Sequence, residues 1–91
     1  MPRTLPLPAD GYEAIPDFPE LIRHPDVLAG RPCIRGTRIS VDLILGFLAA
    51  GSSVDEIEAA YEDLAKEEIV AVLRYAAASI PGAPPRESVA A

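Results

Sequence analysis

The chain of 91 residues has one cysteine, one histidine and no apolar run that would cross a bilayer, and each shortage excludes a class of protein. Cys33 has no second cysteine with which to form an internal disulfide, so nothing indicates an oxidising compartment. Cys33 and His24 alone do not make up a zinc ligand set. A membrane span needs ~20 apolar residues, and the first ten residues lack the apolar core of a signal peptide. We therefore expect a cytoplasmic protein without metal or other cofactor.

Positive charge is also scarce, because the formal net charge is −6. The charges are unevenly distributed along the chain. Residues 23–40 carry four arginines and one aspartate, whereas residues 41–80 carry eight acidic residues, one lysine and one arginine. The whole surface is therefore unsuited to non-specific nucleic-acid binding. The sequence describes a basic segment attached to an acidic body.

The length allows one domain, and a domain this small buries only ~60% of the surface of its unfolded chain. A homodimer that shares apolar surface is therefore expected. Residues 1–20 contain five prolines, which predict an extended arm and not a packed element. Pro81 ends the last helix, and residues 81–91 are expected to form a flexible tail. The folded domain is expected over residues 21–80.

Residues 33–40 predict a short β-hairpin, since Ile34 and Ile39 flank a turn that contains Gly36. Apolar residues at helical spacing then predict helices over about 41–50, from Ser53 onward, and over about 66–80. Ser53 and Glu56 have the spacing of a capping box. The fold class is therefore mainly α, a short hairpin followed by a trihelical helix-turn-helix domain. The apolar stripe of the last helix is wide, which suggests that one side meets a partner.

The segment Gly30-Arg31-Pro32-Cys33-Ile34-Arg35-Gly36-Thr37-Arg38-Ile39 resembles the bacterial family catalogued as domain of unknown function 433. Gly51, the helix start at residues 53–57 and Tyr61 also fit that pattern, and the resemblance covers roughly residues 22–80. It looks like the VapB-type antitoxins assigned to the family. The resemblance implies a winged-helix-like or homeodomain-like fold, a PIN-like nuclease toxin as partner, and operator DNA binding that represses the protein's own operon.

One departure from the family pattern concerns the start of the last helix. Ala65 stands where the family usually has threonine or serine, and alanine cannot accept the N–H groups there, a loss of ~1 kcal/mol. Asp63 would replace that cap if the helix began earlier.

The arginines of the hairpin have two interpretations. A guanidinium forms paired hydrogen bonds to phosphates or carboxylates, so a partner-binding role is one. The other is structural, with one arginine pairing to a carboxylate of the body such as Asp42. Gly30 and Gly36 are better explained by backbone geometry than by phosphate binding. The candidate DNA- or partner-binding residues are Arg31, Arg35, Thr37 and Arg38.

The last helix would read DNA in a conventional helix-turn-helix, and Lys66 and Arg74 are its candidate contacts. Glu67 and Glu68 lie beside Lys66 at the start of this helix, and their negative charges would be repelled by the phosphates that line the groove. Arg3 and Arg86, on the two ends, are candidates for blocking the acidic active site of a nuclease toxin.

No catalytic constellation can be assembled, so an enzyme is not expected. One histidine and one cysteine lack an orienting third group, and adjacent carboxylates on a helix point about 100° apart. The sequence therefore favours an antitoxin that inhibits a PIN-like ribonuclease. The alternatives are a stand-alone DNA-binding regulator and a dimeric protein-interaction module without DNA binding.

Overall fold

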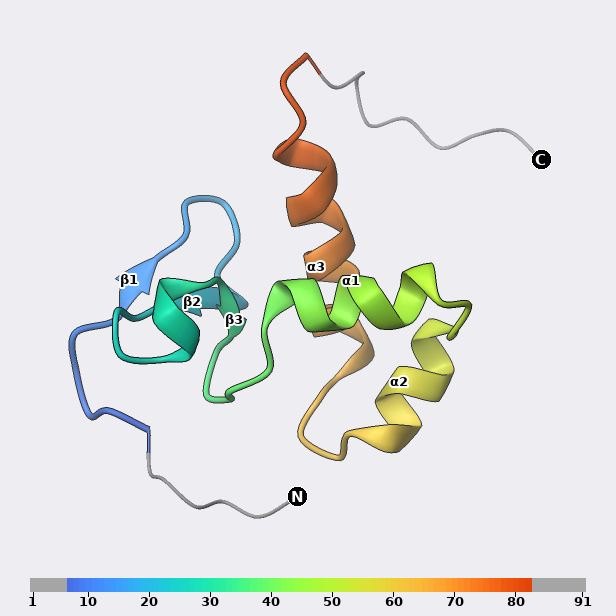
Figure 1. The fold of residues 1–91 in the computed structure, drawn as a ribbon, viewed down its shortest axis with the longest axis horizontal. Coiled ribbons are helices and arrows are strands. Elements are labelled where there is room, and N and C mark those ends of the chain that lie inside the picture. Colours follow the sequence, from blue (N-terminus) through green and yellow to red (C-terminus); the bar gives the residue numbers. More distant parts are fainter. Residues whose placement is uncertain (1–6, 83–91) are drawn as a thin grey trace.

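The computed structural model describes residues 7–82, which form a short sheet and three helices (Figure 1). The sheet and α2 lie at opposite ends of the body, joined by α1, and the second half of α3 projects away from it. In chain order the elements are β1 (Glu13–Ala14), β2 (Leu21–Arg23), a 3-10 turn (Leu28–Gly30), β3 (Cys33–Ile34), α1 (Val41–Ala49), α2 (Val54–Ala60) and α3 (Lys66–Ala78).

The sheet is antiparallel, in the order β1-β2-β3. Glu13 pairs with Arg23 on one side of β2, and Leu21 pairs with Ile34 on the other. Leu21 is fully buried and Ile22 nearly so, as expected for the central strand of a sheet that packs on helices. The predicted mainly α class is therefore confirmed, but the β part is a three-stranded sheet and not a lone hairpin.

The expectation of an unpacked arm over residues 1–20 is wrong for residues 12–20. This segment supplies β1, and Ile15 and Phe18 are buried in the core. Its prolines do not prevent packing, because strands this short and the turn between them need few backbone donors. The Phe18 N–H donates to the Ile15 carbonyl at 3.0 Å, and the Leu21 N–H donates to the Phe18 carbonyl at 3.0 Å. Residues 1–6 and 83–91 lie outside the described residues.

The turn predicted between Ile34 and Ile39 is present, and the Ile34 N–H donates to the Ile39 carbonyl at 3.0 Å. The return strand amounts to a single bridge between Cys33 and Ser40. It is this short because Ser40 is already the N-cap of α1, and its side chain accepts the Leu43 N–H at 3.1 Å. The strand partner of β3 is therefore β2.

The three helices lie where the periodicity predicts them, and both hydrogen bonds of the Ser53–Glu56 capping box are formed. The start of α3 agrees with the predicted span of about 66–80, and the earlier start that would let Asp63 act as the cap does not occur. The helix begins at Lys66 and not near Asp63, and Ala65 makes no side-chain cap. Two glutamates take the place of the missing side-chain cap. Glu68 accepts the Ala65 N–H at 2.8 Å, and Glu58 of α2 accepts the Lys66 N–H at 3.1 Å.

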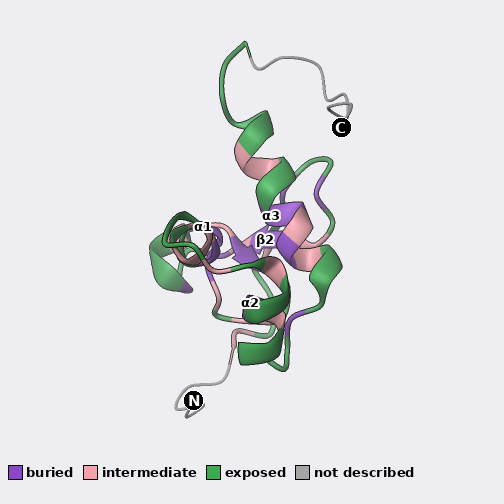
Figure 2. Ribbon diagram, turned by 90° about the vertical axis from the view of Figure 1, so that its right-hand side faces the viewer, coloured by how far each residue is buried: buried purple, intermediate pink, exposed green. Residues whose placement is uncertain are grey.

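One apolar core joins the sheet to the helices, and Figure 2 shows its buried residues where α1, α3 and β2 meet. All three helices contribute to this core, and the basic segment of residues 23–40 packs against it through Ile34. No helix within residues 7–82 is long and apolar enough to cross a membrane. The core residues are Ile15, Phe18, Leu21, Ile34, Val41, Ile44, Ile57, Leu64, Ile69 and Val72.

Candidate partner-binding surface

The turn over residues 35–38, called here the arginine turn, carries two of the four candidate binding residues as exposed side chains, Arg35 and Arg38. Gly36 takes a φ of +79°, which glycine adopts without the strain other residues would have. The Thr37 hydroxyl donates to the Ile34 carbonyl at 2.8 Å and accepts the Ile39 N–H at 3.0 Å. Thr37 therefore holds the turn in shape and presents the arginines.

Arg31 precedes the turn and pairs with Asp42 at the start of α1. Its Nη1 atom lies 3.4 Å from Oδ2 of Asp42, which confirms that one arginine pairs with this carboxylate. Both side chains are exposed, 63% and 60%, and a pair so accessible to water contributes only ~0–1 kcal/mol. Arg31 thus remains accessible to a partner that offers a better-placed acid.

Arg35 attaches the turn to the segment before β2. Its backbone N–H donates to the Glu20 carbonyl at 2.9 Å, and its side-chain Nε donates to the Pro19 carbonyl at 3.0 Å. The first bond uses the main chain and the second uses one nitrogen of the guanidinium, while the residue is still exposed. Arg35 is therefore oriented by the fold and keeps part of its surface in solvent.

Arg38 lies near Cys33, whose side chain is 1% exposed. Burial raises the pKa of the Cys33 thiol, the Asp42 carboxylate adds to that rise, and the Arg38 charge opposes it. The thiol donates to the Arg31 carbonyl at 3.2 Å. Cys33 is therefore a protonated, buried side chain of the core and not a nucleophile.

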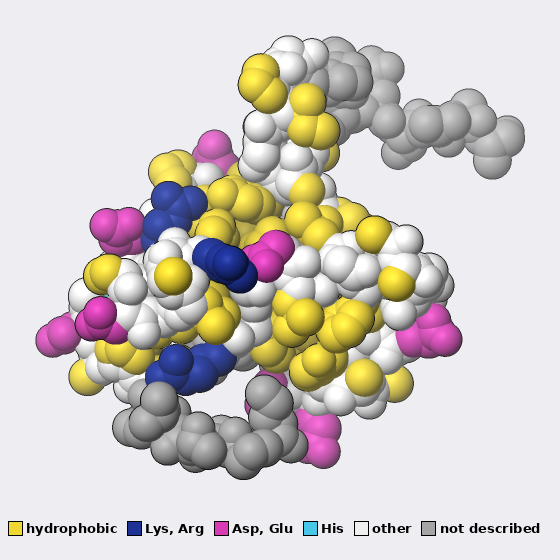
Figure 3. Space-filling model, in the orientation of Figure 1, with side chains coloured by type: hydrophobic (Ala, Val, Ile, Leu, Met, Phe, Trp, Pro, Cys, Tyr) yellow, Lys and Arg dark blue, Asp and Glu magenta, His cyan; other side chains and the backbone are white. Residues whose placement is uncertain are grey.

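Positive charge gathers over the sheet and the arginine turn on the face shown in Figure 3, and the α1–α2 side of that face shows no lysine or arginine. Arg23, on β2, belongs to the same half of the molecule but is half-buried, and its Nη2 atom lies 3.4 Å from the Tyr75 hydroxyl. Its Nε atom is buried without a hydrogen-bond partner. Nothing in the sequence distinguishes Arg23 from the other arginines of the segment, since its contact on α3 is 52 residues away.

The candidate DNA contacts of α3 are not joined to this surface into one basic face. Lys66 forms an ion pair with Asp55 of α2 at 2.8 Å, and the hydrogen bond to Asp55 raises the pKa of Lys66. Arg74 is exposed eight residues further along, ~12 Å at the rise of an α-helix. Glu67 and Glu68 occupy the first turn. The leading end of α3 is therefore locally acidic.

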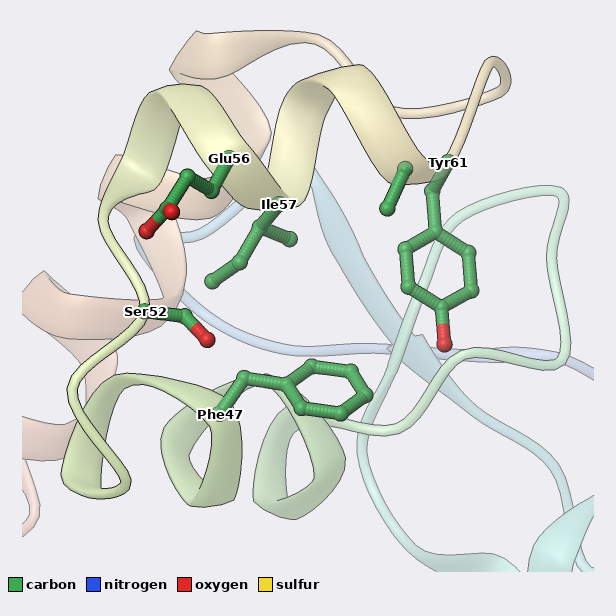
Figure 4. A pocket seen from close by; sticks show the side chains of 6 residues that line it. Phe47, Ser52, Glu56, Ile57 and Tyr61 are labelled. Atoms are coloured by element: carbon green, nitrogen blue, oxygen red, sulfur yellow. The ribbon is translucent and has the colours of Figure 1, made fainter.

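A shallow apolar hollow of about 410 Å³ lies between α1 and α2 (Figure 4). The Phe47 and Tyr61 rings lie side by side along it, with centroids 5.9 Å apart. The Glu56 carboxylate at its edge is already engaged, since it accepts the Ser53 N–H at 2.8 Å. The hollow thus suits an apolar side chain better than a polar ligand. Its lining residues are Phe47, Ser52, Glu56, Ile57, Ala60 and Tyr61.

His24 has a structural role. His24 is buried, its Nδ1 atom accepts the Asp26 N–H at 2.9 Å, and its Nε2 atom lies 2.9 Å from the Asp10 carbonyl oxygen. It therefore anchors the chain before β1. Within residues 7–82 no group of three His, Cys, Asp or Glu side chains could hold a metal ion. Arg3 and Arg86 lie outside the described residues.

The fold and the surface define a class of small helical protein with a short sheet and an arginine-bearing turn. Comparison with family models then places it: the chain belongs to the family described as "Protein of unknown function (DUF433)", whose model matches residues 22–76. That range contains the whole arginine turn. No curated protein matches the chain, and no solved structure matches it either.

Proposed function

We propose that this protein is an antitoxin that binds and inhibits a PIN-like ribonuclease. The observation that carries the proposal is the arginine turn, which presents Arg35 and Arg38 to solvent from a rigid loop on an otherwise acidic molecule. Guanidinium groups form charge-assisted, paired hydrogen bonds to carboxylates. A nuclease of this class gathers acids around its metal, and the resemblance to VapB-type antitoxins supplies that class of partner.

The charges of α3 favour a protein partner over DNA. A helix that enters the major groove approaches phosphates on both sides, and each acid at its leading end is repelled. Glu67 is exposed in that turn, and Lys66 is paired with Asp55. The net charge of −6 adds a repulsion that the few arginines of the turn have to overcome.

The order of α2, a short connection and α3 supports a second function, a DNA-binding regulator that acts alone or represses its own operon. In that case a dimer would present two arginine turns to the phosphates, with Arg74 on the flank. This alternative predicts binding without any toxin, with an affinity that falls steeply as salt rises.

We propose the following roles for the candidate residues. Arg35 and Arg38 are the principal partner contacts, Arg31 exchanges Asp42 for an acid of the partner, and Thr37 keeps the turn in shape. Arg3 and Arg86 are further candidates for entry into the acidic site of the nuclease. We place the complex in the cytoplasm, as expected for an inhibitor that meets a toxin made beside it.

The test is to produce the chain with the product of the gene adjacent to its own, and to measure co-purification and RNA cleavage. Replacing both Arg35 and Arg38 by alanine should weaken the complex by roughly 10- to 100-fold, the usual cost of losing buried arginine contacts. Arg74→Ala, on exposed α3, is the matched control and should bind as the wild type does. Unchanged inhibition by the double variant, or the lack of a co-purifying nuclease, would overturn the proposal.

A further inference from the structure

The 3-10 turn between β2 and β3 has a backbone conformation that two of its three residues disfavour. Leu28 has a φ of +51°, Ala29 of +57° and Gly30 of +82°, so all three are left-handed. Glycine adopts this region without strain, and asparagine and aspartate tolerate it better than other residues do. Within residues 7–82 the remaining non-glycine residue with a positive φ is Asp17. Leu28 and Ala29 are therefore the strained positions in this part of the chain.

The chain on both sides fixes the turn in this conformation. Val27, which precedes it, is 3% exposed, and its carbonyl accepts the Gly30 N–H at 3.1 Å. At the other end the Arg31 N–H donates to the Leu28 carbonyl at 3.1 Å. Strained residues persist where the surrounding structure determines their conformation in this way. The path of the chain thus requires a left-handed turn, and glycine at both positions 28 and 29 would form it with less strain.

The side chain of Leu28 does not explain why leucine stands at this position. Leu28 is 38% exposed and lies outside the apolar core. An exposed leucine alone is common on protein surfaces, but a leucine held in a conformation that favours glycine is not. Backbone strain of this kind is concentrated where proteins bind other molecules. A contact outside the chain accounts for both the exposure and the strain.

Leu28 belongs to the basic half of the molecule. It precedes Arg31 by three residues, and the hydrogen bond between their backbones holds both on one turn. Figure 3 shows hydrophobic side chains between the dark blue clusters on this half. Protein interfaces combine an apolar centre with a polar rim, and arginine is enriched in them. Phosphates offer hydrogen bonds but no apolar recess, so this combination favours a protein partner.

We propose that Leu28 is the apolar anchor of the partner-binding surface and that the left-handed turn holds it out from the body. It would enter an apolar recess of the partner, bordered by carboxylates that face Arg31 and the arginine turn. The arginines then set the orientation of the complex, and Leu28 adds the burial of apolar surface. This inference rests on the proposed function, because the partner is the nuclease proposed above.

Replacing Leu28 by glycine should change folding and binding in opposite directions. The melting temperature should rise by roughly 2–5 °C, since relief of the strain exceeds the added freedom of glycine in the unfolded chain. The complex with the product of the adjacent gene should weaken by roughly 10- to 100-fold, because a buried leucine side chain is lost. Thermal unfolding by circular dichroism and titration calorimetry measure the two effects.

Two further variants separate the side chain from the backbone. Ala29→Gly is the matched control, because it relieves the same strain one residue later and removes only an exposed methyl group. It should raise the melting temperature and bind nearly as the wild type does. Leu28→Asn places a residue that tolerates the left-handed region but has no apolar surface to bury. It should weaken the complex as Leu28→Gly does.

Each possible result bears on the role of Leu28. A Leu28→Gly protein that melts below the wild type would overturn the inference, since leucine would then stabilise the fold. Wild-type affinity of both Leu28→Gly and Leu28→Asn would also overturn it and would leave the antitoxin function standing. If the wild-type chain itself does not bind the product of the adjacent gene, the antitoxin function fails and this inference fails with it.

Discussion

Glu58 belongs to α2, yet its Oε2 atom accepts the backbone N–H of Lys66, the first residue of α3, at 3.1 Å. The N-terminus of a helix exposes N–H groups and a partial positive charge, and a carboxylate satisfies both. The bond therefore supplies what Ala65 cannot. It also fixes the angle between α2 and α3, because its two ends are on different helices.

Replacing Glu58 by alanine should lower the free energy of unfolding by about 1 kcal/mol, the usual effect of losing a helix cap. In a domain of this size that corresponds to a fall of roughly 4–8 °C in the melting temperature. Thermal unfolding followed by circular dichroism measures the change. Glu62→Ala is the control, since Glu62 is an exposed acid in the same region. Equal melting temperatures for the two variants would contradict the role given to Glu58.

Thr37→Val keeps the shape of the side chain but removes its hydroxyl, leaving the Ile39 N–H without its acceptor. We expect a loss of about 1–3 kcal/mol in urea unfolding. Thr37→Ser, which keeps the hydroxyl, should recover most of it. A Thr37→Val protein of wild-type stability that fails to bind its partner would instead make Thr37 a direct contact.

The Cys33 thiol should resist alkylation in the folded protein, because burial raises its pKa and so lowers the thiolate fraction. The folded pKa exceeds the ordinary value of 9.0, so stability from the protonated thiol is complete below pH 9.0 and is lost as pH rises through the folded pKa. Alkaline unfolding of Cys33→Ala should therefore depend less on pH than that of the wild type. Fast iodoacetamide labelling at pH 8, without unfolding, would argue against this account.

Gly46→Ala should stabilise the protein by about 0.5–1 kcal/mol, since alanine is the better residue inside a helix. Gly46 lies within α1, and a Cβ atom there would meet nothing within 4 Å. Gly11→Ala is the opposite case, because Gly11 has a φ of +90° and its Cβ would lie 2.9 Å from Nε2 of His24. Denaturant midpoints should therefore move in opposite directions. A destabilised Gly46→Ala would mean that this face of α1 is covered in solution.

The features that depend on neighbouring residues could be predicted from the sequence. The three helices follow from apolar spacing, and the capping box needs only Ser53 and Glu56, which are three residues apart. The turn between Ile34 and Ile39 is equally local. The Arg31–Asp42 pair could be anticipated because the turn brings the chain before β3 back beside the start of α1, where Cys33 and Ser40 form a bridge.

The rest depends on contacts between residues that are far apart in the chain. Strands of two or three residues are too short to show an alternating pattern, so neither β1 nor β2 could be predicted. Phe18 is buried because its ring packs against Tyr75, with centroids 5.5 Å apart. The wide apolar stripe of the last helix likewise does not reveal that Ile80, two residues past the end of α3, is left 62% exposed.

Ile15, Phe18 and Leu21 lie outside the block that the family model matches, which begins at residue 22. The segment that the family model matches is therefore shorter than the segment that forms the core. A fragment cut to the recognisable block would uncover the inner faces of α3 and β3, and we expect it to aggregate. Truncation mapping of binding activity should accordingly keep residues 12–21, because their loss would collapse the scaffold and be mistaken for loss of a ligand contact.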